Sequence, residues 1–268
     1  MTVFDSVLWE SLLGAVIGIV LAFTGAGGGI LSVPLLMFGL HLSVQEAAPI
    51  GMLAVFSSAL LGAVLAWRET LVRYRAAALM GAVGMVMAPV GVLLAQHMPS
   101  QPLMLVFSGV LFYSAWRGLA APSPSLDKAP CVLSTLDRRL IWTLPCAQML
   151  ASTGVLSGLL SGLLGVGGGF VIVPALSRYT NLAVRSVHAT SLAVMTLVSF
   201  SGAVSAVVHG AMNWGVALPF ASGAILALLL GRRFASKVHP KRLQQAFAWF
   251  CMGVAVLMLL RAVGVMRA

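Results

Sequence analysis

Charged residues are scarce in this chain. Only 8% of its 268 residues carry a charge, against about 25% in a typical soluble domain, whereas 60% are hydrophobic. A chain with so few charges cannot cover a water-facing surface. Apolar stretches near the ~20 residues needed to cross a bilayer recur along the whole sequence. The composition therefore predicts an all-α, multi-pass protein of the cell membrane.

Acidic residues are scarcer than basic ones, with six Asp and Glu against 16 Lys and Arg. The resulting net charge of +10 can indicate nucleic-acid binding. Here, however, the basic residues lie in short loops between apolar segments, with little aromatic interleaving. Cytoplasmic loops of membrane proteins have this pattern. The lipid bilayer is therefore the expected partner, and nucleic acid is not.

Cysteine is also rare. The three cysteines, Cys131, Cys146 and Cys251, form no CxxC pair, and their number is odd. This argues against a disulfide framework or a zinc site. Cys146 and Cys251 lie in apolar segments and are expected to be packing residues. We expect no metal and no cofactor.

Glycine, in contrast, is concentrated in a segment that occurs twice. Residues 24–34 read TGAGGGILSVP, and residues 164–174 read LGVGGGFVIVP, 140 positions later. Glycines outside this motif also match at the same offset. Gly14 matches Gly154, and Gly18 matches Gly158. Matches at one offset over such a length predict an internal repeat. We expect a first repeat at 1–120, a linker at 121–143 and a second repeat at 144–268.

Each predicted repeat contains four near-full-length apolar segments and one of about ten residues, which follows the glycines. In the first repeat the basic residues follow segments 47–67 and 103–119, whereas in the second they follow segments 170–179 and 214–231. Equivalent loops thus differ in charge. The positive-inside rule then predicts inverted repeats, each with a glycine-broken hairpin plus three transmembrane helices. Eight spans with parallel halves are the alternative.

The repeated glycine run is the main functional candidate. A glycine run inside an apolar segment breaks the helix and frees backbone N–H groups, which cannot stay unpaired in hydrocarbon. A helix beginning near Ile30 or Phe170 would aim its N–H groups and positive dipole end at the turn, which is an anion-binding arrangement. Pro34 and Pro174 would fall early in these helices, where they support the helix break. Two facing turns would form a site at the membrane midplane.

The candidate substrate-binding residues are Gly25, Gly27, Gly28, Gly29, Gly165, Gly167, Gly168, Gly169, Thr190 and Ser191. For the glycines, the alternative is that small residues merely allow tight helix packing. We prefer packing for the GxxxG pairs outside the motif and ligand binding for the glycine runs followed by proline. A nucleotide-binding loop fits poorly, because the motif lacks the Lys-Ser/Thr of a P-loop.

The duplicated GxGGGxxxVP motif resembles that of the sulfite exporter TauE/SafE family of membrane permeases. The resemblance covers essentially the whole chain, including its size and the basic linker between the halves. The small-Thr-Ser-Leu run often seen in the family is present at 189–192, whereas 49–52 reads PIGM, which makes the site asymmetric. The resemblance implies transport of sulfite, sulfoacetate or other organosulfur anions. Composition and spacing alone indicate only a small anion.

Several polar residues near the spans have two interpretations. Thr190 and Ser191 could donate hydrogen bonds to an oxyanion or bond back to their own helix. His188 could join them or lie at the membrane interface. Glu10 and Glu46 are candidates for proton coupling, as is His188, but both acids could lie at the interface and Glu46 could stabilise a helix N-terminus.

Transport is the preferred function. An intramembrane enzyme using a serine with His188 is one alternative, but no GxSxG elbow or HExxH motif occurs. A membrane scaffold without substrate is another, although a scaffold has little need of two glycine-broken helices. We therefore expect no catalysis. The sequence leaves open the direction of transport, coupling to protons, and whether the chain forms a homo-oligomer.

Overall fold

The computed structural model describes residues 3–24, 28–119, 131, 143–235 and 240–262, and the regular elements in these ranges are helices. The first part of the chain forms α1 (Val3–Thr24), the 3₁₀ turn η1 (Gly28–Leu31), α2 (Ser32–Gly39), α3 (Val44–Arg68), α4 (Tyr74–His97) and α5 (Ser100–Leu119). The second part forms α6 (Leu144–Leu164), α7 (Gly169–Tyr179), α8 (Val184–Val208), α9 (Trp214–Ala235) and α10 (Pro240–Ala262). Seven of the described helices are long and apolar enough to cross a bilayer. The prediction of an all-α, multi-pass membrane protein is confirmed.

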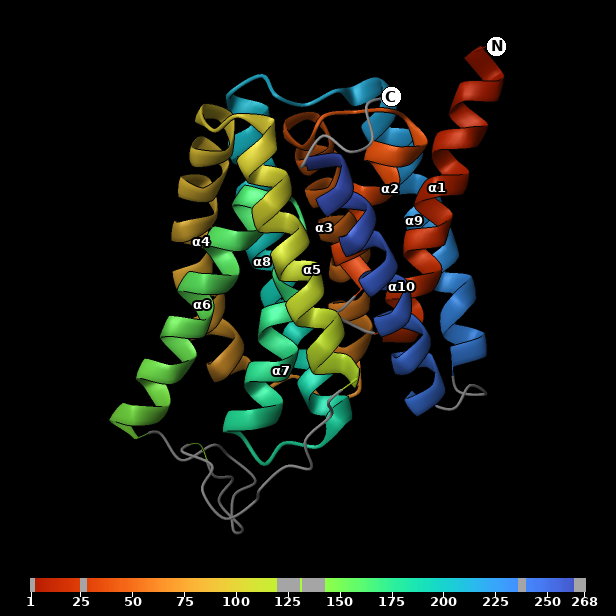
Figure 1. Ribbon diagram of the computed structural model, residues 1–268. Helices are drawn as coiled ribbons and strands as arrows, with labels where there is room; N and C mark the ends of the chain where they lie inside the picture. The colour runs from red at the N-terminus through yellow and green to blue at the C-terminus, as the bar shows by residue number, and fades with distance from the viewer. Residues whose placement is uncertain (1–2, 25–27, 120–130, 132–142, 236–239, 263–268) are drawn as a thin grey trace.

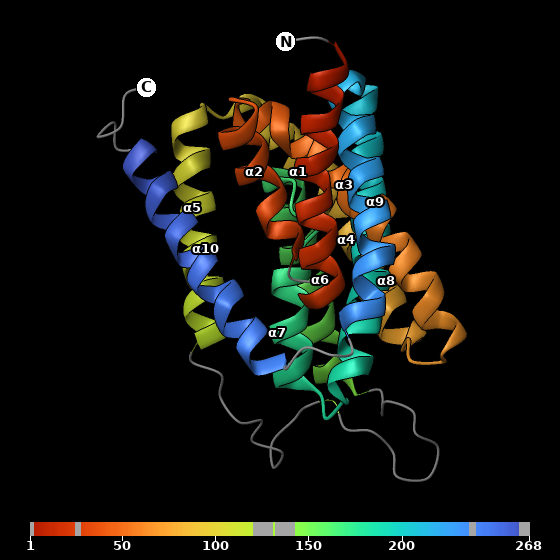
Figure 2. The same cartoon turned by 90° about the vertical axis from the view of Figure 1, so that its right-hand side faces the viewer.

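The helices stand side by side in one bundle and start from opposite ends of it in the two parts of the chain. In Figures 1 and 2, α1 begins at the upper end, where α10 ends. The helix α5 ends at the lower end, and α6 begins there. The short helix α2 therefore runs upward from the middle of the bundle, whereas α7 runs downward from it (Figure 1).

Basic residues gather at the lower end of the bundle, where α3, α5, α7 and α9 end and where α4, α6, α8 and α10 begin (Figure 1). The basic side chains described there are Arg68, Arg73, Arg75, Arg178, Arg185 and Arg233. The helix positions of Arg117, Arg232, Lys241 and Arg242 lie at the same end. Arg261, in the last turn of α10, is the one Lys or Arg among the described residues of the upper end. The two ends of the bundle thus differ strongly in charge.

Small residues bring the outer helices together at matching points. A Cβ on Gly14 of α1 would stand 2.8 Å from the carbonyl carbon of Phe220 in α9. A Cβ on Gly154 of α6 would stand 2.7 Å from the carbonyl oxygen of Met80 in α4. Phe220 and Met80 are also 140 positions apart, so the same contact is made twice. The prediction that the GxxxG glycines serve helix packing is confirmed.

The long helices α3 and α8 pack against each other in the middle of the bundle. Their inward side chains, such as Ile50 and Val194, are fully buried, whereas apolar side chains such as Leu156 and Leu226 on α6 and α9 are more than half exposed. Exposed Leu side chains on outer helices are expected where the neighbour is lipid. The core therefore lies along α3 and α8, with the other helices around it.

The segments after the glycines are short, as predicted. The helix α2 has 8 residues and α7 has 11, so the longer of them covers about 16 Å, roughly half of a ~30 Å hydrocarbon core. Pro34 is in the first turn of α2, but Pro174 lies inside α7, beyond its first turn. Only Pro34 therefore occupies a position where the missing N–H has no helical partner to lose.

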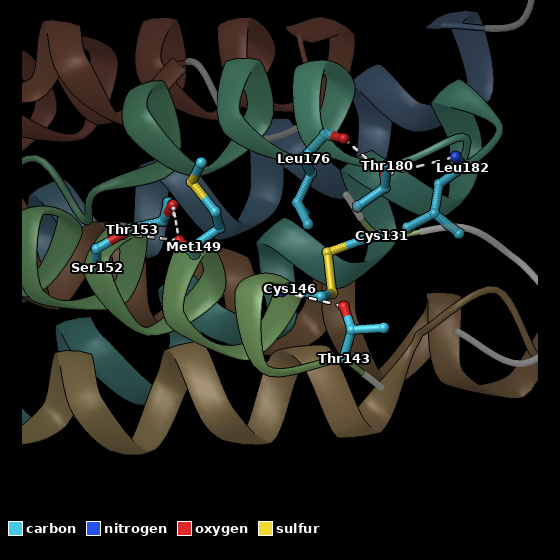
Figure 3. Close-up of a disulfide and its surroundings, with 9 residues drawn as sticks. All are labelled: Cys131, Thr143, Cys146, Met149, Ser152, Thr153, Leu176, Thr180 and Leu182. Carbon is cyan, nitrogen blue, oxygen red and sulfur yellow. Dashed lines mark hydrogen bonds between the residues drawn. A yellow bond between two sulfur atoms is a disulfide. The ribbon is translucent and has the colours of Figure 1, made fainter. Parts of the chain in front are cut away.

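Cys131 and Cys146 form a disulfide at the lower end of the bundle (Figure 3), which corrects the sequence prediction. Cys146 lies in the first turn of α6, and the Cys131 N–H donates to the carbonyl oxygen of Tyr179 at the end of α7 (3.1 Å). The pairing depends on where α6 and α7 place these backbones, and cysteine spacing does not encode that. Cys251 is a buried free thiol in α10, as expected for a packing residue.

Candidate functional site

The turn between α6 and α7 is built from glycines in a left-handed backbone conformation. Gly165, Gly167 and Gly168 have φ angles of 71°, 76° and 72°. This region costs a residue with a Cβ about 1–2 kcal/mol. Gly169 begins α7, and all four glycines are buried. The backbone geometry of this second glycine turn therefore requires glycine.

The turn between α1 and α2 is described in part. Gly25 and Gly27 lie outside the described residues, whereas Gly28 and Gly29 are buried in the 3₁₀ turn that precedes α2. A Cβ on Gly28 would stand 2.6 Å from the backbone nitrogen of Leu21 in α1. This first glycine turn is therefore packed directly against the helix before it.

The two glycine turns contact each other in the middle of the bundle. A Cβ on Gly29 would stand 2.6 Å from the carbonyl oxygen of Val166 in the second turn. It would also stand 2.9 Å from Val55 Cγ2 of α3 and 3.6 Å from Met195 Cε of α8. A Cβ on Gly167 would stand 3.3 Å from the same Met195 methyl group. Val55 and Met195 are 140 positions apart, so α3 and α8 contribute equivalent side chains between the turns.

Backbone N–H groups are available at the second glycine turn. The Gly165 N–H donates to the carbonyl oxygen of Ser161 (2.8 Å). The N–H groups of Val166, Gly167 and Gly168 make no hydrogen bond within the described part of the chain. The helix α7 starts at this point, so its first N–H groups lack helical partners and its positive dipole end lies at the turn. Chemically, such an arrangement suits an anion.

A serine hydroxyl lies beside these N–H groups. Ser199 Oγ of α8 is 2.9 Å from the point where a Cβ on Gly167 would stand. The Ser199 side chain is fully buried, and no described group forms a hydrogen bond with its hydroxyl. Ser157, in contrast, donates to the carbonyl oxygen of Gly168 (3.3 Å). Leaving a buried hydroxyl unpaired costs about 1–3 kcal/mol, so Ser199 is a candidate donor to a ligand at the turn.

Further buried hydroxyls without a described partner belong to Ser58, Ser161 and Ser191. Ser191 lies four positions before Met195 and eight before Ser199, so the three residues share one face of α8. Sequence reasoning singled out Ser191 but missed Ser58 and Ser199. No local signal distinguishes Ser58 from its neighbour Ser57, or Ser199 from the other serines of α8, and serine hydroxyls in apolar helices often bond to their own helix.

Thr190 and His188 lie nearer the lower end of α8. Thr190 Oγ1 accepts a hydrogen bond from the Arg73 N–H (3.1 Å), in the connection between α3 and α4. Thr190 precedes Met195 by five residues, which is about 7.5 Å along the helix axis. His188 is half-buried, and its Nδ1 has no partner among the described residues. The structure therefore brings neither residue into the described contacts of the glycine turns.

The two acidic candidates lie near the upper end and differ in their surroundings. Glu10 of α1 is buried, and its Oε2 has no described hydrogen-bond partner. Glu46 is exposed and completes a capping box at the start of α3, where its carboxylate accepts hydrogen bonds from the Ser43 N–H (2.9 Å) and hydroxyl (2.8 Å). The geometry thus agrees with helix capping by Glu46, the alternative to proton coupling.

Comparison with known proteins fits this architecture. Residues 11–258 match the family described as Sulfite exporter TauE/SafE, and the match includes both glycine turns. The chain belongs to this family. The resemblance inferred from the duplicated motif is confirmed, and the chain is a member of a family of membrane transporters.

Relatives with curated names are described only as probable membrane transporter proteins. One from Xylella fastidiosa (strain 9a5c) is 30% identical over 261 residues, covering 93% of this chain and 93% of its own. YdhB of Bacillus subtilis (strain 168) is 25% identical, covering 91% of this chain and 96% of its own. One from Methanocaldococcus jannaschii is 27% identical, and the match covers 87% of this chain and 88% of the relative. No solved structure matches the chain.

Proposed function

We propose that the chain carries a small anion across the cell membrane and binds it between the two glycine turns. The observation that carries this proposal is the contact between Gly29 and Val166, with the unpartnered Ser199 hydroxyl beside the second turn. Backbone N–H groups and hydroxyls can both donate to an anion. Such a site needs no lysine or arginine inside the bilayer, where their charge is costly.

The substrate class is sulfite, sulfoacetate or a related organosulfur anion. The family description, sulfite exporter, supports this class, whereas the names of the relatives give no substrate. The oxygen atoms of a sulfite or sulfonate group accept several hydrogen bonds at once. Several hydrogen-bond donors that meet at one turn therefore suit such a group better than a single cationic side chain does.

We infer further that residues 1–120 and 144–268 are inverted repeats joined by the segment 121–143. The opposite starting ends of α1 and α6 support this inference (Figure 1), as do the matching contacts of Gly14 and Gly154. The positive-inside rule puts the basic lower end in the cytoplasm. The start of α1 and the end of α10 then face the opposite side.

Side chains at the contact between the two glycine turns control access of the substrate to the proposed site. Val55 and Met195 both lie against Gly29 and Gly167, where the two glycine turns meet. A substrate can therefore enter only when α3 and α8 move these side chains apart. Transporters with inverted repeats alternate access in this way, by rocking one repeat against the other around a fixed site.

Glu10 is the remaining acidic candidate for proton coupling, since Glu46 is engaged in its capping box. Ionisable residues within membrane helices are default candidates for proton relays. Membership of a transporter family supports transport rather than catalysis, so no enzymatic step is proposed.

The test is flux into proteoliposomes that contain the purified protein. Radiolabelled sulfite and sulfoacetate are offered with and without an imposed pH gradient, and protein-free liposomes are the control. Saturable uptake of either anion is the expected result. An increase with the gradient that is lost in Glu10→Gln supports coupling through Glu10. Absence of flux for both anions overturns the substrate class.

A further inference from the structure

A hollow opens between α5, α6 and α7, away from the contact between the glycine turns. Its volume is about 460 Å³. It is lined by Gly109 and Tyr113 of α5, Met149 and Leu156 of α6, and both ends of α7, from Phe170 to Arg178. In Figure 1, α7 lies between α5 and α6 at the lower end of the bundle. The hollow therefore runs along α7, from the middle of the bundle to its basic end.

The dimensions of this hollow match one leaflet of a bilayer. The helix α7 has 11 residues and is about 16 Å long, roughly half of the ~30 Å hydrocarbon core. Leu156, on the wall formed by α6, is 53% exposed. In a membrane-spanning helix such an exposed leucine faces lipid. An acyl chain of the lower leaflet can therefore reach the hollow from the side.

A basic side chain, that of Arg178, lies where this hollow reaches the lower end of the bundle. Arg178 lies in the last turn of α7 and is exposed. Within the described part of the chain, no carboxylate forms an ion pair with it. Basic side chains at the membrane surface attract anionic lipids, and the planar guanidinium group binds phosphate through two parallel hydrogen bonds.

At three positions the opposite repeat carries an aromatic residue where this hollow has a glycine, a methionine and an arginine. At the offset of 140, Gly109 corresponds to Trp249, and Arg178 corresponds to Phe38. Met149 corresponds to Trp9, whose indole N–H donates to the carbonyl oxygen at the end of α2 (3.2 Å). The difference is reversed at Tyr113 of the hollow, which corresponds to Gly253. The residues that line this hollow are therefore not repeated at the equivalent positions of the other repeat.

We propose that this hollow binds one acyl chain of an anionic phospholipid, with the headgroup phosphate on Arg178. The walls along α5 and α6 are mainly apolar, so they suit hydrocarbon better than a small hydrated anion. The position of Arg178 at the end of the hollow accounts for a negative headgroup. This lipid site is separate from the proposed transport site, because Ser199 and the contact between the glycine turns do not line it.

Two matched glycine substitutions test the proposal. A Cβ on Gly109 or on Gly253 would meet nothing within 4 Å, so both positions accept a side chain without backbone strain. Only Gly109 lines the hollow. Gly109→Trp puts an indole ring on the wall of the hollow, at the position where the opposite repeat has Trp249. Gly253→Trp adds the same bulk to α10, away from the hollow.

The measurement is native mass spectrometry of the purified protein titrated with phosphatidylglycerol or phosphatidylcholine. For the wild type and Gly253→Trp we expect at least threefold tighter binding of phosphatidylglycerol. Arg178→Gln should bind both lipids equally, and Gly109→Trp should bind both at least fivefold more weakly. Size-exclusion profiles verify that each variant is folded.

Wild-type phosphatidylglycerol binding by Gly109→Trp would overturn the proposal, as would an unchanged lipid preference in Arg178→Gln. Displacement of the lipid by millimolar sulfoacetate would also overturn it, because the hollow would then belong to the substrate path. Ser199→Ala should leave lipid binding unchanged, which separates this proposal from that of the transport site.

Discussion

Gly158 of α6 lies directly against Gly84 of α4, and a Cβ on Gly158 would stand 2.7 Å from the Gly84 Cα. Gly18 of α1 makes the corresponding contact with Ala224 of α9, at the offset of 140. The two pairs of helices are thus held together at equivalent points. Close backbone approach of this kind is a main source of stability between membrane helices.

Replacing Gly158 with leucine should therefore separate α6 from α4. The new side chain would meet backbone atoms, which cannot move aside, so we expect a destabilisation of about 3 kcal/mol or more. Gly253→Leu, in open space, should cost less than about 0.5 kcal/mol. Unfolding of both variants in mixed micelles measures the difference. Equal stability of the two would contradict the packing described for α4 and α6.

Glu46 should matter for stability and not for transport. Its carboxylate bonds to the Ser43 N–H and hydroxyl at the start of α3. Loss of such a cap typically costs about 0.5–2 kcal/mol. We expect Glu46→Ala to unfold more easily while its proteoliposome flux keeps the wild-type dependence on the pH gradient. Loss of that dependence with unchanged stability would restore Glu46 as a coupling residue.

The cysteine pair reports which side of the membrane the basic end faces. The Cα atoms of Cys131 and Cys146 are 5.1 Å apart, within the range of a disulfide. The two cysteines are joined and buried in the structure, but disulfides are rare in the reducing cytoplasm, where this end is proposed to lie. We therefore expect the pair to be reduced in cells and to form the disulfide when the oxidant diamide is added. Gel shifts with maleimide-polyethylene glycol, in a Cys251→Ser background, count the free thiols. A disulfide already present before oxidation would put the basic end outside and contradict the proposed orientation.

Features that depend on local sequence were predicted well. The long spans, the short helices α2 and α7, and the packing role of Gly14 and Gly154 all follow from apolar length and from small residues at helical spacing. These properties depend on the sequence of one segment at a time, so they can be predicted without knowledge of which helices are neighbours.

Features that depend on which segments meet were not predictable. The pairing of Cys131 with Cys146 requires the end of α7 beside the start of α6. The bond from the Arg73 N–H to Thr190 joins residues 117 positions apart. Ser199 became a candidate only because its hydroxyl lies beside Gly167 without a described partner. Nothing in the local sequence distinguishes it from the other serines of α8.

The most direct test of the central claim is the KM for sulfite or sulfoacetate in Ser199→Ala, with Ser57→Ala as the matched control. The Ser57 hydroxyl bonds back to its own helix, so its loss should leave transport unchanged. A hydrogen bond to a charged group is worth about 1.5–3 kcal/mol, so Ser199→Ala should raise KM about tenfold or more without loss of protein stability. A wild-type KM in Ser199→Ala would contradict binding of the anion at the second glycine turn.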